Sequence, residues 1–206
     1  MIHHLIDQNS EEWDALRLGK FTASTFADLF MAKSTAGYRN AIIKVAFERV
    51  TGEGEENYSN RWMQRGHEKE PFAVENYELL SFNTCEPAGF YEYDEYTGAS
   101  PDRKIVGLNG GCEFKCPSFQ VYNEYLEANS DPKNPKLPKA YYWQIIGQLL
   151  CTGWDFIDYM PYYSPKLKQI LVRVERSEHE ASIELLKAKL IECIEEVKIL
   201  IERIRQ

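Results

Sequence analysis

Two carboxylates and a lysine lie close together in the stretch GASPDRKIVGLNGGCEFKCPS, which covers residues 98–118. Asp102 follows a proline, and Glu113, Phe114 and Lys115 come after a glycine-rich turn. Side chains alternate faces along a strand, so a strand here projects Glu113 and Lys115 to one side and Phe114 to the other. The LNGG turn folds the chain back, which allows Asp102 to approach Glu113.

These residue types suit the hydrolysis of a phosphate ester with a divalent cation. Two carboxylates form an oxygen site for Mg²⁺, or for Mn²⁺ as a substitute, and such a cation keeps waters for a phosphate. The cation polarises the phosphate, while Lys115 beside it can orient or help to deprotonate the attacking water. The alternative is a solvated network of the three side chains on an exposed sheet face. The proline, the turn spacing and the apolar flanks favour the site.

Whole-chain properties limit the partners and the compartment. The chain has 206 residues, of which 44% are hydrophobic and 13% aromatic, so it is expected to fold as one domain over residues 1–206. The net charge of −8 argues against nucleic acid, but the total does not report how charge is distributed. The five cysteines form no CxxC pair and are expected to be free thiols. No targeting signal and no membrane-spanning run is found, which predicts a cytoplasmic protein.

The first third of the chain is predicted to be helical. Asn9 is expected to cap the first helix and Gly19 to end it, and Thr22 is expected to cap a second helix over 23–32. A third helix covers 38–53, with its apolar face at Ile42, Ile43, Ala46, Phe47 and Val50. Residues 60–82 are predicted to be helical, with Pro71 either kinking the helix or starting another.

The remaining elements predict an α/β fold with a mixed sheet. Strands are expected over 89–93, 97–107, 112–118, 154–164 and 168–176, the last burying Ile170, Val172 and Val174. An apolar helix over 140–153 crosses between them, after a loop rich in lysine and proline. The final helix, from about Glu178, carries an apolar seam that is expected to pack on the domain or on another subunit. The seam consists of Ile183, Leu186, Leu190, Cys193, Val197, Leu200 and Ile204.

Four blocks in order resemble the phage lambda exonuclease family, the alkaline exonucleases of the restriction-endonuclease-like superfamily with the signature PD-(D/E)xK. The blocks are ALRLGKFTAS at 15–24, RGHEKEPFA at 65–73, SPD with GGCEFKCPS within 100–118, and AYYWQIIGQ at 140–148. The resemblance implies a restriction-endonuclease-like fold, with a mixed central sheet flanked by helices and a C-terminal helix.

The resemblance also assigns roles at the site. Asp102 and Glu113 resemble the metal-binding carboxylates, the Phe114 backbone carbonyl completes the metal shell, and Lys115 resembles the catalytic lysine. Glu70, with Glu68 as the alternative, matches a glutamate that supports a metal or its water. Gln144 matches the glutamine that places the nucleophilic water, with Gln148 as the competing assignment.

Arg17 and Ser24 match the phosphate-binding residues of that family. An arginine fork can grip two phosphate oxygens, and the start of a helix attracts anions. The alternatives are an ion pair of Arg17 with Asp14 or Glu12, and plain helix capping by Ser24.

The activity implied by the resemblance is a Mg²⁺-dependent, processive 5′→3′ exonuclease that acts on the ends of linear duplex DNA. The family also implies a ring-shaped trimer, a single-strand annealing protein as partner, and a phage or prophage protein in a bacterial host. In a ring, Lys33, Arg39, Lys44 or the loop 132–139 would line the bore. The alternatives are a related endonuclease or repair nuclease of the same fold, and a catalytically silent DNA-binding or assembly module.

Overall fold

The strands form two mixed sheets. The computed structural model describes residues 1–54, 61–131 and 134–206, without the side chains of residues 61–64 and 67. One sheet has the order β1-β4-β5-β2 and the other β3-β6-β7-β8-β9. The strands are β1 Ile2–His4, β2 Phe21–Thr22, β3 Cys85–Pro87, β4 Phe90–Asp94, β5 Thr97–Ala99, β6 Arg103–Ile105, β7 Gly110–Lys115, β8 Phe156–Pro161 and β9 Val172–Glu175.

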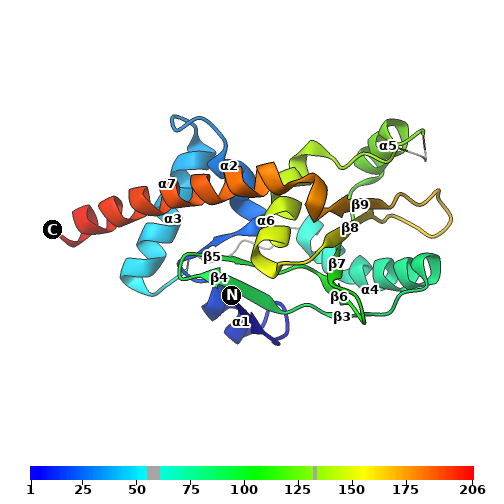
Figure 1. Cartoon of the computed structure of the whole chain (residues 1–206), viewed down its shortest axis with the longest axis horizontal. Helices are drawn as coiled ribbons and strands as arrows, with labels where there is room; N and C mark the ends of the chain where they lie inside the picture. Colours follow the sequence, from blue (N-terminus) through cyan, green and yellow to red (C-terminus); the bar gives the residue numbers. More distant parts are fainter. Residues whose placement is uncertain (55–60, 132–133) are drawn as a thin grey trace.

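Helices cover both faces of the larger sheet, with α4 on one face and α6 and α7 on the other (Figure 1). The α-helices are α1 Glu11–Arg17, α2 Phe26–Leu29, α3 Ala36–Thr51, α4 Arg61–Ser81, α5 Phe119–Ala128, α6 Tyr142–Thr152 and α7 Glu180–Arg205. The short 3₁₀ turns are η1 Ala23–Thr25, η2 Lys139–Tyr141 and η3 Arg176–Glu178. The predicted α/β fold with a mixed sheet is confirmed. None of the described helices is long and apolar enough to cross a membrane.

Strand β7 is central to the larger sheet, because it pairs parallel to β8 and antiparallel to β6. Cys112 and Phe114 point into an apolar cluster with Tyr77 of α4. Glu113 points the other way and accepts hydrogen bonds from α6. The predicted alternation along β7 is therefore confirmed, and it delivers one carboxylate to the α6 side of the sheet.

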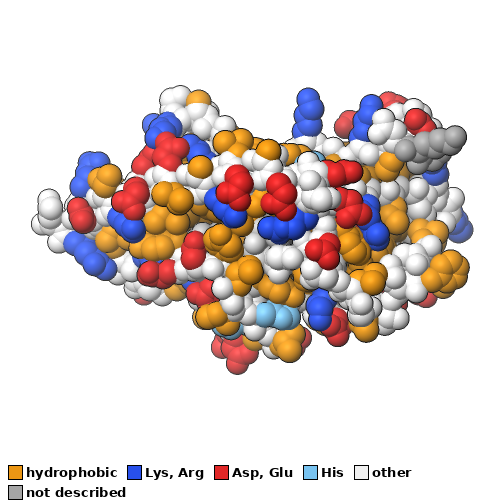
Figure 2. Space-filling model, in the orientation of Figure 1, with side chains coloured by type: hydrophobic (Ala, Val, Ile, Leu, Met, Phe, Trp, Pro, Cys, Tyr) orange, Lys and Arg blue, Asp and Glu red, His pale blue; other side chains and the backbone are white. Residues whose placement is uncertain are grey.

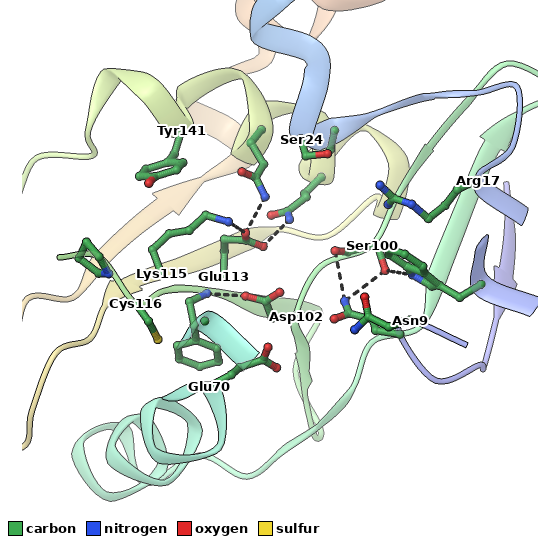
Figure 3. A pocket seen from close by; sticks show the side chains of 18 of the residues that line it. Asn9, Arg17, Ser24, Glu70, Ser100, Asp102, Glu113, Lys115, Cys116 and Tyr141 are labelled. Atoms are coloured by element: carbon green, nitrogen blue, oxygen red, sulfur yellow. Dashed lines mark hydrogen bonds and ion pairs between the residues drawn. The ribbon is translucent and has the colours of Figure 1, made fainter. Parts of the chain in front are cut away.

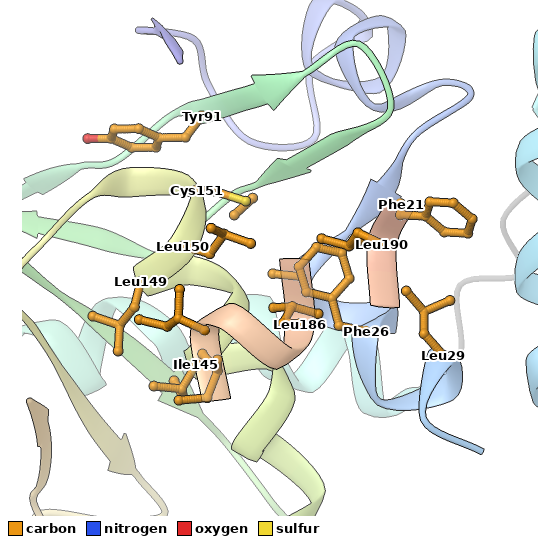
Figure 4. Close-up of a cluster of buried hydrophobic side chains, with 14 of the residues drawn as sticks. Phe21, Phe26, Leu29, Tyr91, Ile145, Leu149, Leu150, Cys151, Leu186 and Leu190 are labelled. Atoms are coloured by element: carbon orange, nitrogen blue, oxygen red, sulfur yellow. The ribbon is translucent and has the colours of Figure 1, made fainter. Parts of the chain in front are cut away.

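The main core lies between the sheets and the helices α2, α3, α6 and α7 (Figure 4). The predicted seam of α7 packs on this core, with Ile183, Leu186, Leu190, Cys193 and Val197 buried. The opposite side of α7 is solvated, and Figure 2 shows acidic and basic side chains interspersed along it. Leu200 and Ile204, the last two residues of the seam, are partly buried against the same core.

Two predicted helix starts are wrong. Ser10, not Asn9, caps α1, since its side chain accepts the Trp13 N–H, while Asn9 adopts a left-handed φ of 65°. The segment after Thr22 is one 3₁₀ turn followed by the four-residue α2, and Thr22 makes no side-chain capping bond. Gly19 ends α1 as predicted, with φ of 68°.

Other expectations need correction in detail. The predicted strand over 97–107 is two strands, β5 and β6, which belong to different sheets and are separated at Ser100, Pro101 and Asp102. Helix α3 buries Ile42 and Ala46 but exposes Ile43 and Phe47, and it also buries Tyr38 and Val45, so its buried face is shifted from the predicted one. Pro71 lies inside the single helix α4.

Gly147 of α6 allows close packing against η1 and α2. A Cβ atom at this position would lie 2.3 Å from Phe26 Cδ2, and the Phe26 side chain is fully buried. We therefore expect Gly147→Ala to lower the free energy of unfolding by about 1–3 kcal/mol, as overpacking does in a tight core. Urea denaturation measures this. Gly66→Ala is the matched control, because no heavy atom lies within 4 Å of a Cβ there. Equal stability of the wild type and Gly147→Ala would contradict the expectation.

Candidate active site

A cavity of about 680 Å³ lies where the chain passes from the smaller sheet to the larger one. Its walls come from α1, η1, α4, β7, η2 and α6, and the linker Ser100–Asp102 between β5 and β6 lies in it (Figure 3). All the site residues predicted from the sequence line this one cavity, which joins positions nearly 130 residues apart: Arg17, Ser24, Glu70, Asp102, Glu113, Phe114, Lys115 and Gln144.

Asp102 and Glu113 converge as the sequence predicts, although Asp102 precedes β6 rather than lying within a strand. The Phe114 N–H donates to Asp102 Oδ2 at 2.7 Å, which ties the linker to β7. The other oxygen, Oδ1, has no hydrogen-bond partner among the described residues. Burial raises the pKa of Asp102 well above its ordinary value, and the negative charge of Glu113 raises it further.

Glu113 is almost fully buried, and polar groups surround its carboxylate. Lys115 Nζ and Gln144 Nε2 each lie 2.5 Å from Oε1, and Gln148 Nε2 lies 2.6 Å from Oε2. Both glutamines that competed for one role therefore contact the same carboxylate, one on each oxygen. The Gln148 Oε1 atom is buried without a partner in the described part of the chain.

Lys115 projects into the cavity beside the carboxylates (Figure 3). Burial alone lowers the pKa of its ammonium, but the charges of Glu113 and Asp102 outweigh burial and raise the pKa above its ordinary value. Its Nζ also lies 5.3 Å from the ring centroid of Tyr141, which stacks on Tyr159. The lysine is thus held as a cation at the point where the carboxylates meet.

Glu70 lines the cavity from α4, but its carboxylate forms an ion pair with Arg103 at 2.8 Å. Its charge still reaches the site, since it helps to raise the pKa of Asp102. The alternative, Glu68, is exposed on the same helix. The side chain of His67, which directly precedes Glu68, lies outside the described residues.

The donor set fits a hard divalent cation. Glu113 is buried and Asp102 is half-buried, and the two carboxylates lie against a single lysine, so their mutual repulsion is only partly compensated. The described side chains contain no group of three or more His, Cys, Asp or Glu that could hold a metal ion. Two carboxylates and the Phe114 carbonyl would leave the remaining coordination positions to water and phosphate, which is how Mg²⁺ is usually bound.

Arg17 and Ser24 form the other end of the cavity. The Arg17 guanidinium lies 4.0 Å from the Trp13 ring centroid and donates only a long bond, 3.5 Å, to Thr22 Oγ1. Ser24 Oγ lies 3.3 Å from the same hydroxyl. Arg17 makes no ion pair with a described residue, so the predicted alternative of a pair with Asp14 or Glu12 is wrong. Because η1 and α2 are short, a helix dipole adds little at Ser24.

Glu48 of α3 fixes the turn that carries Arg17. Its buried carboxylate accepts the Gly19 N–H at 2.8 Å, and the neighbouring Arg49 donates to the Gly19 carbonyl at 3.2 Å. Both backbone groups of Gly19 are therefore held by adjacent residues of one helix. This anchors α1 on the main core.

Sequence reasoning missed the residues that join the two ends of the cavity. Trp13 Nε1 donates to Ser100 Oγ at 2.8 Å, and Gln8 Nε2 donates to the Pro101 carbonyl at 3.1 Å. Trp13 lies four residues before Arg17, a helical spacing that places the two on one face, and Ser100 precedes the Pro-Asp pair directly. These local signals were present, but the contacts themselves are tertiary.

The basic residues that a ring would place in its bore do not line this cavity. Lys33 pairs with Glu192 and Glu196 of α7, and Lys44 lies 3.7 Å from Glu48. Arg39 is exposed on α3. In the predicted loop, residues 132–133 lie outside the described part of the chain.

Known proteins share this fold. An alkaline exonuclease, LHK-Exo from Laribacter hongkongensis, is 30% identical to this chain, with a TM-score of 0.78 over 95% of this chain and 98% of that one. A structure of LHK-Exo in complex with dAMP gives the same values. A phage-related exonuclease from Haemophilus somnus 129PT, 16% identical with a TM-score of 0.66 over 90% of this chain and 96% of that one, shows likeness of fold alone.

A comparison with curated protein sequences finds no match. Residues 12–155 match the family described as the YqaJ-like viral recombinase domain. The match contains α1, α4, β7 and α6, and hence the elements that line the cavity. The chain belongs to the YqaJ-like viral recombinase family, and its fold is that of the alkaline exonucleases.

Proposed function

We propose that the chain is a Mg²⁺-dependent exodeoxyribonuclease that digests linear duplex DNA from its 5′ ends. The single observation that carries the proposal is the convergence of Asp102, Glu113 and Lys115 in the cavity that also contains Arg17. The family and the likeness to LHK-Exo support a nuclease. The direction, processivity and metal are our own extension.

In this proposal Asp102 and Glu113 would hold the cation, together with the Phe114 carbonyl. A bound Mg²⁺ supplies charge stabilisation to the phosphate and lowers the pKa of water. The chain contributes the rest. Lys115 places a positive charge beside the attacked phosphate and orients the water, and Gln144 and Gln148 hold Glu113 in position. Tyr141 forms part of the cavity wall beside Lys115.

The proposal extends to partners by resemblance. A nuclease that exposes single strand suits a single-strand annealing protein as partner, and a viral recombinase family is the setting for that pair. The same proposal includes a ring-shaped trimer and a location in the bacterial cytoplasm. It also includes a single nuclease domain over residues 1–206.

Digestion of linear and closed circular duplex of the same sequence tests the function. With Mg²⁺, we expect the linear form to release mononucleotides and leave single strand while the closed circle persists, and EDTA to stop the reaction. A nicked or linearised circle would indicate an endonuclease instead. Persistence of both forms in Mg²⁺ and in Mn²⁺ would contradict nuclease function.

A second test concerns the terminal phosphate. We expect duplex with a 5′-phosphate to be digested faster than duplex with a 5′-hydroxyl, because the Arg17 fork has donors that no described carboxylate occupies. Losing one charge-assisted contact costs on the order of 1.5–3 kcal/mol, or roughly tenfold to a hundredfold in rate. Arg17→Ala should therefore erase the preference.

The measurement is a competition between the two duplexes at fixed low salt, since phosphate binding weakens with ionic strength. Arg203→Ala, which removes an exposed arginine near the end of α7, is the control and should keep the preference. The assignment of Arg17 to the terminal phosphate would be contradicted if the wild type digested both duplexes equally. It would also be contradicted if Arg17→Ala still preferred the 5′-phosphate.

A further inference from the structure

A second hollow of about 370 Å³ lies between α4 and the segment that follows β8. We call it the α4 groove. One wall is formed by Arg65, Lys69 and Phe72 of α4, and the facing wall by Tyr163 and Pro165. Neither the family match nor the catalytic geometry gives this groove a role.

The groove combines positive charge with aromatic rings. The Arg65 guanidinium lies 4.8 Å from the Tyr163 ring centroid, and Lys69 Nζ lies 5.6 Å from that of Phe72. Phe72 is 53% exposed. Neither cation forms an ion pair with any residue that the structure describes, which distinguishes them from the paired lysines of α7. The Arg65 Nε is buried and has no hydrogen-bond partner in that same part of the chain.

The α4 groove adjoins the catalytic cavity. Gly66 and Pro117 line the catalytic cavity, and Arg65 reaches the Pro117 carbonyl at 3.5 Å from the other side. The two hollows therefore share the wall between β7 and the first half of α4.

The two walls of the groove are held at a fixed spacing. Asn76 of α4 donates to Gln169 Oε1 at 3.0 Å, and Gln169 donates to the Ser164 carbonyl at 3.0 Å. Tyr163 also packs edge-on against Phe119 of α5. The groove is therefore built into the fold, and its ring faces are held in place.

We propose that the α4 groove binds a segment of single-stranded DNA that continues from the strand held in the catalytic cavity. This inference rests on the proposed function. Unpaired bases stack on aromatic side chains, while lysine and arginine contact the phosphates between them. In a duplex the bases already stack on each other, so its base faces are not available to Phe72 and Tyr163. The groove is thus selective for single strand on physical grounds.

The test is fluorescence anisotropy with a labelled oligothymidylate of about 12 nucleotides, a length within the usual single-strand site range. The oligonucleotide carries a 5′-hydroxyl and is titrated in EDTA at low salt, so that binding is measured without cleavage. Lys69→Glu and Tyr163→Ala are each expected to raise its Kd about tenfold. Tyr163→Phe keeps the ring and should bind as the wild type does.

Lys198→Glu is the matched control, since it makes the same charge change on an exposed lysine of α7. It should leave the Kd within about twofold of the wild type, as expected for a screened, distant charge. A blunt duplex of equal length should show a smaller effect of Tyr163→Ala than the single strand does.

Three results would overturn the inference: unchanged Kd values in both groove variants, an equal loss in Lys198→Glu, or an equal effect of Tyr163→Ala on duplex and single strand. The outcome is separable from the nuclease assay. If the wild type cleaves linear duplex but the groove variants bind single strand normally, the groove proposal is wrong and the proposed function stands. If single-strand binding depends on the groove but the protein cleaves no duplex, the proposed nuclease function is wrong and the groove proposal stands.

Discussion

Asp102→Ala and Glu113→Ala are each expected to abolish cleavage of linear duplex, with a loss of at least about 10³-fold in kcat. The two carboxylates are the charges that would hold the cation, and Glu113 also organises Lys115, Gln144 and Gln148. Removing either side chain discards the charge that stabilises the phosphoryl transition state. Initial rates of nucleotide release in saturating Mg²⁺ measure the loss.

The isosteric variants Asp102→Asn and Glu113→Gln separate chemistry from folding, because they remove the charge and keep the shape. They should be as inactive as the alanine variants while retaining the circular dichroism spectrum and most of the DNA affinity. Glu86→Gln is the matched control, since Glu86 is an exposed carboxylate on β3 of the same sheet. Full activity in Asp102→Asn or Glu113→Gln would contradict the assignment of that residue to the active site.

Lys115→Ala should lose turnover to a similar extent and still bind Mg²⁺. An ammonium cannot be a metal ligand, and Glu113 keeps the donors Gln144 and Gln148 when the lysine is removed. Lys115→Arg should rescue poorly, since a guanidinium is larger and presents a planar fork in place of a compact ammonium. Calorimetric titration of Mg²⁺, run beside the rate assay, distinguishes a loss of turnover from a loss of metal binding.

Lys104→Ala provides the control for this experiment. Lys104 is a partly exposed lysine of β6, paired with Glu86 on the neighbouring strand, and its removal should change neither rate nor metal binding. A Lys115→Ala variant that no longer bound Mg²⁺ would contradict the assigned role, because the lysine would then be holding the carboxylates together.

The convergence of Asp102, Glu113 and Lys115 was predictable because their arrangement is local. Alternation along one strand places Glu113 opposite to Phe114, and a short turn returns Asp102 to the same strand end. Both patterns survive in the structure. The buried seam of α7 was predictable for the same reason, since one helical period decides which residues face the core.

The choice between Gln144 and Gln148 could not be made from sequence. The two residues lie one helical turn apart on the same face, and a carboxylate has two oxygens that can accept one bond from each. Sequence reasoning treated the residues as competitors, whereas the buried Glu113 accepts both.

The errors at the N-terminal half come from competition between near-equal local signals. Asn9 and Ser10 are adjacent capping residues, and the structure uses the serine as the cap while the asparagine takes a left-handed turn conformation. Strands β1 and β2 of the smaller sheet were missed because strands of two or three residues carry no measurable period. Helix α5 was missed although Ser118 caps it.

Contacts between distant segments were beyond sequence reasoning. The hydrogen bond from Trp13 to Ser100 spans 87 residues, and the ion pair of Glu70 with Arg103 joins α4 to β6. Both depend on how helices seat on the sheets. They decide where Arg17 and Glu70 lie relative to Asp102.

The most direct test of the account is the order in which labels leave a linear duplex that carries different fluorophores on its 5′ and 3′ terminal nucleotides. In Mg²⁺ the wild type is expected to release the 5′ label first, as a mononucleotide, and Asp102→Asn is expected to release neither label. Release of the 3′ label first would contradict the proposed direction. Release of either label by Asp102→Asn at the wild-type rate would show that the cavity of Asp102, Glu113 and Lys115 is not the site of cleavage.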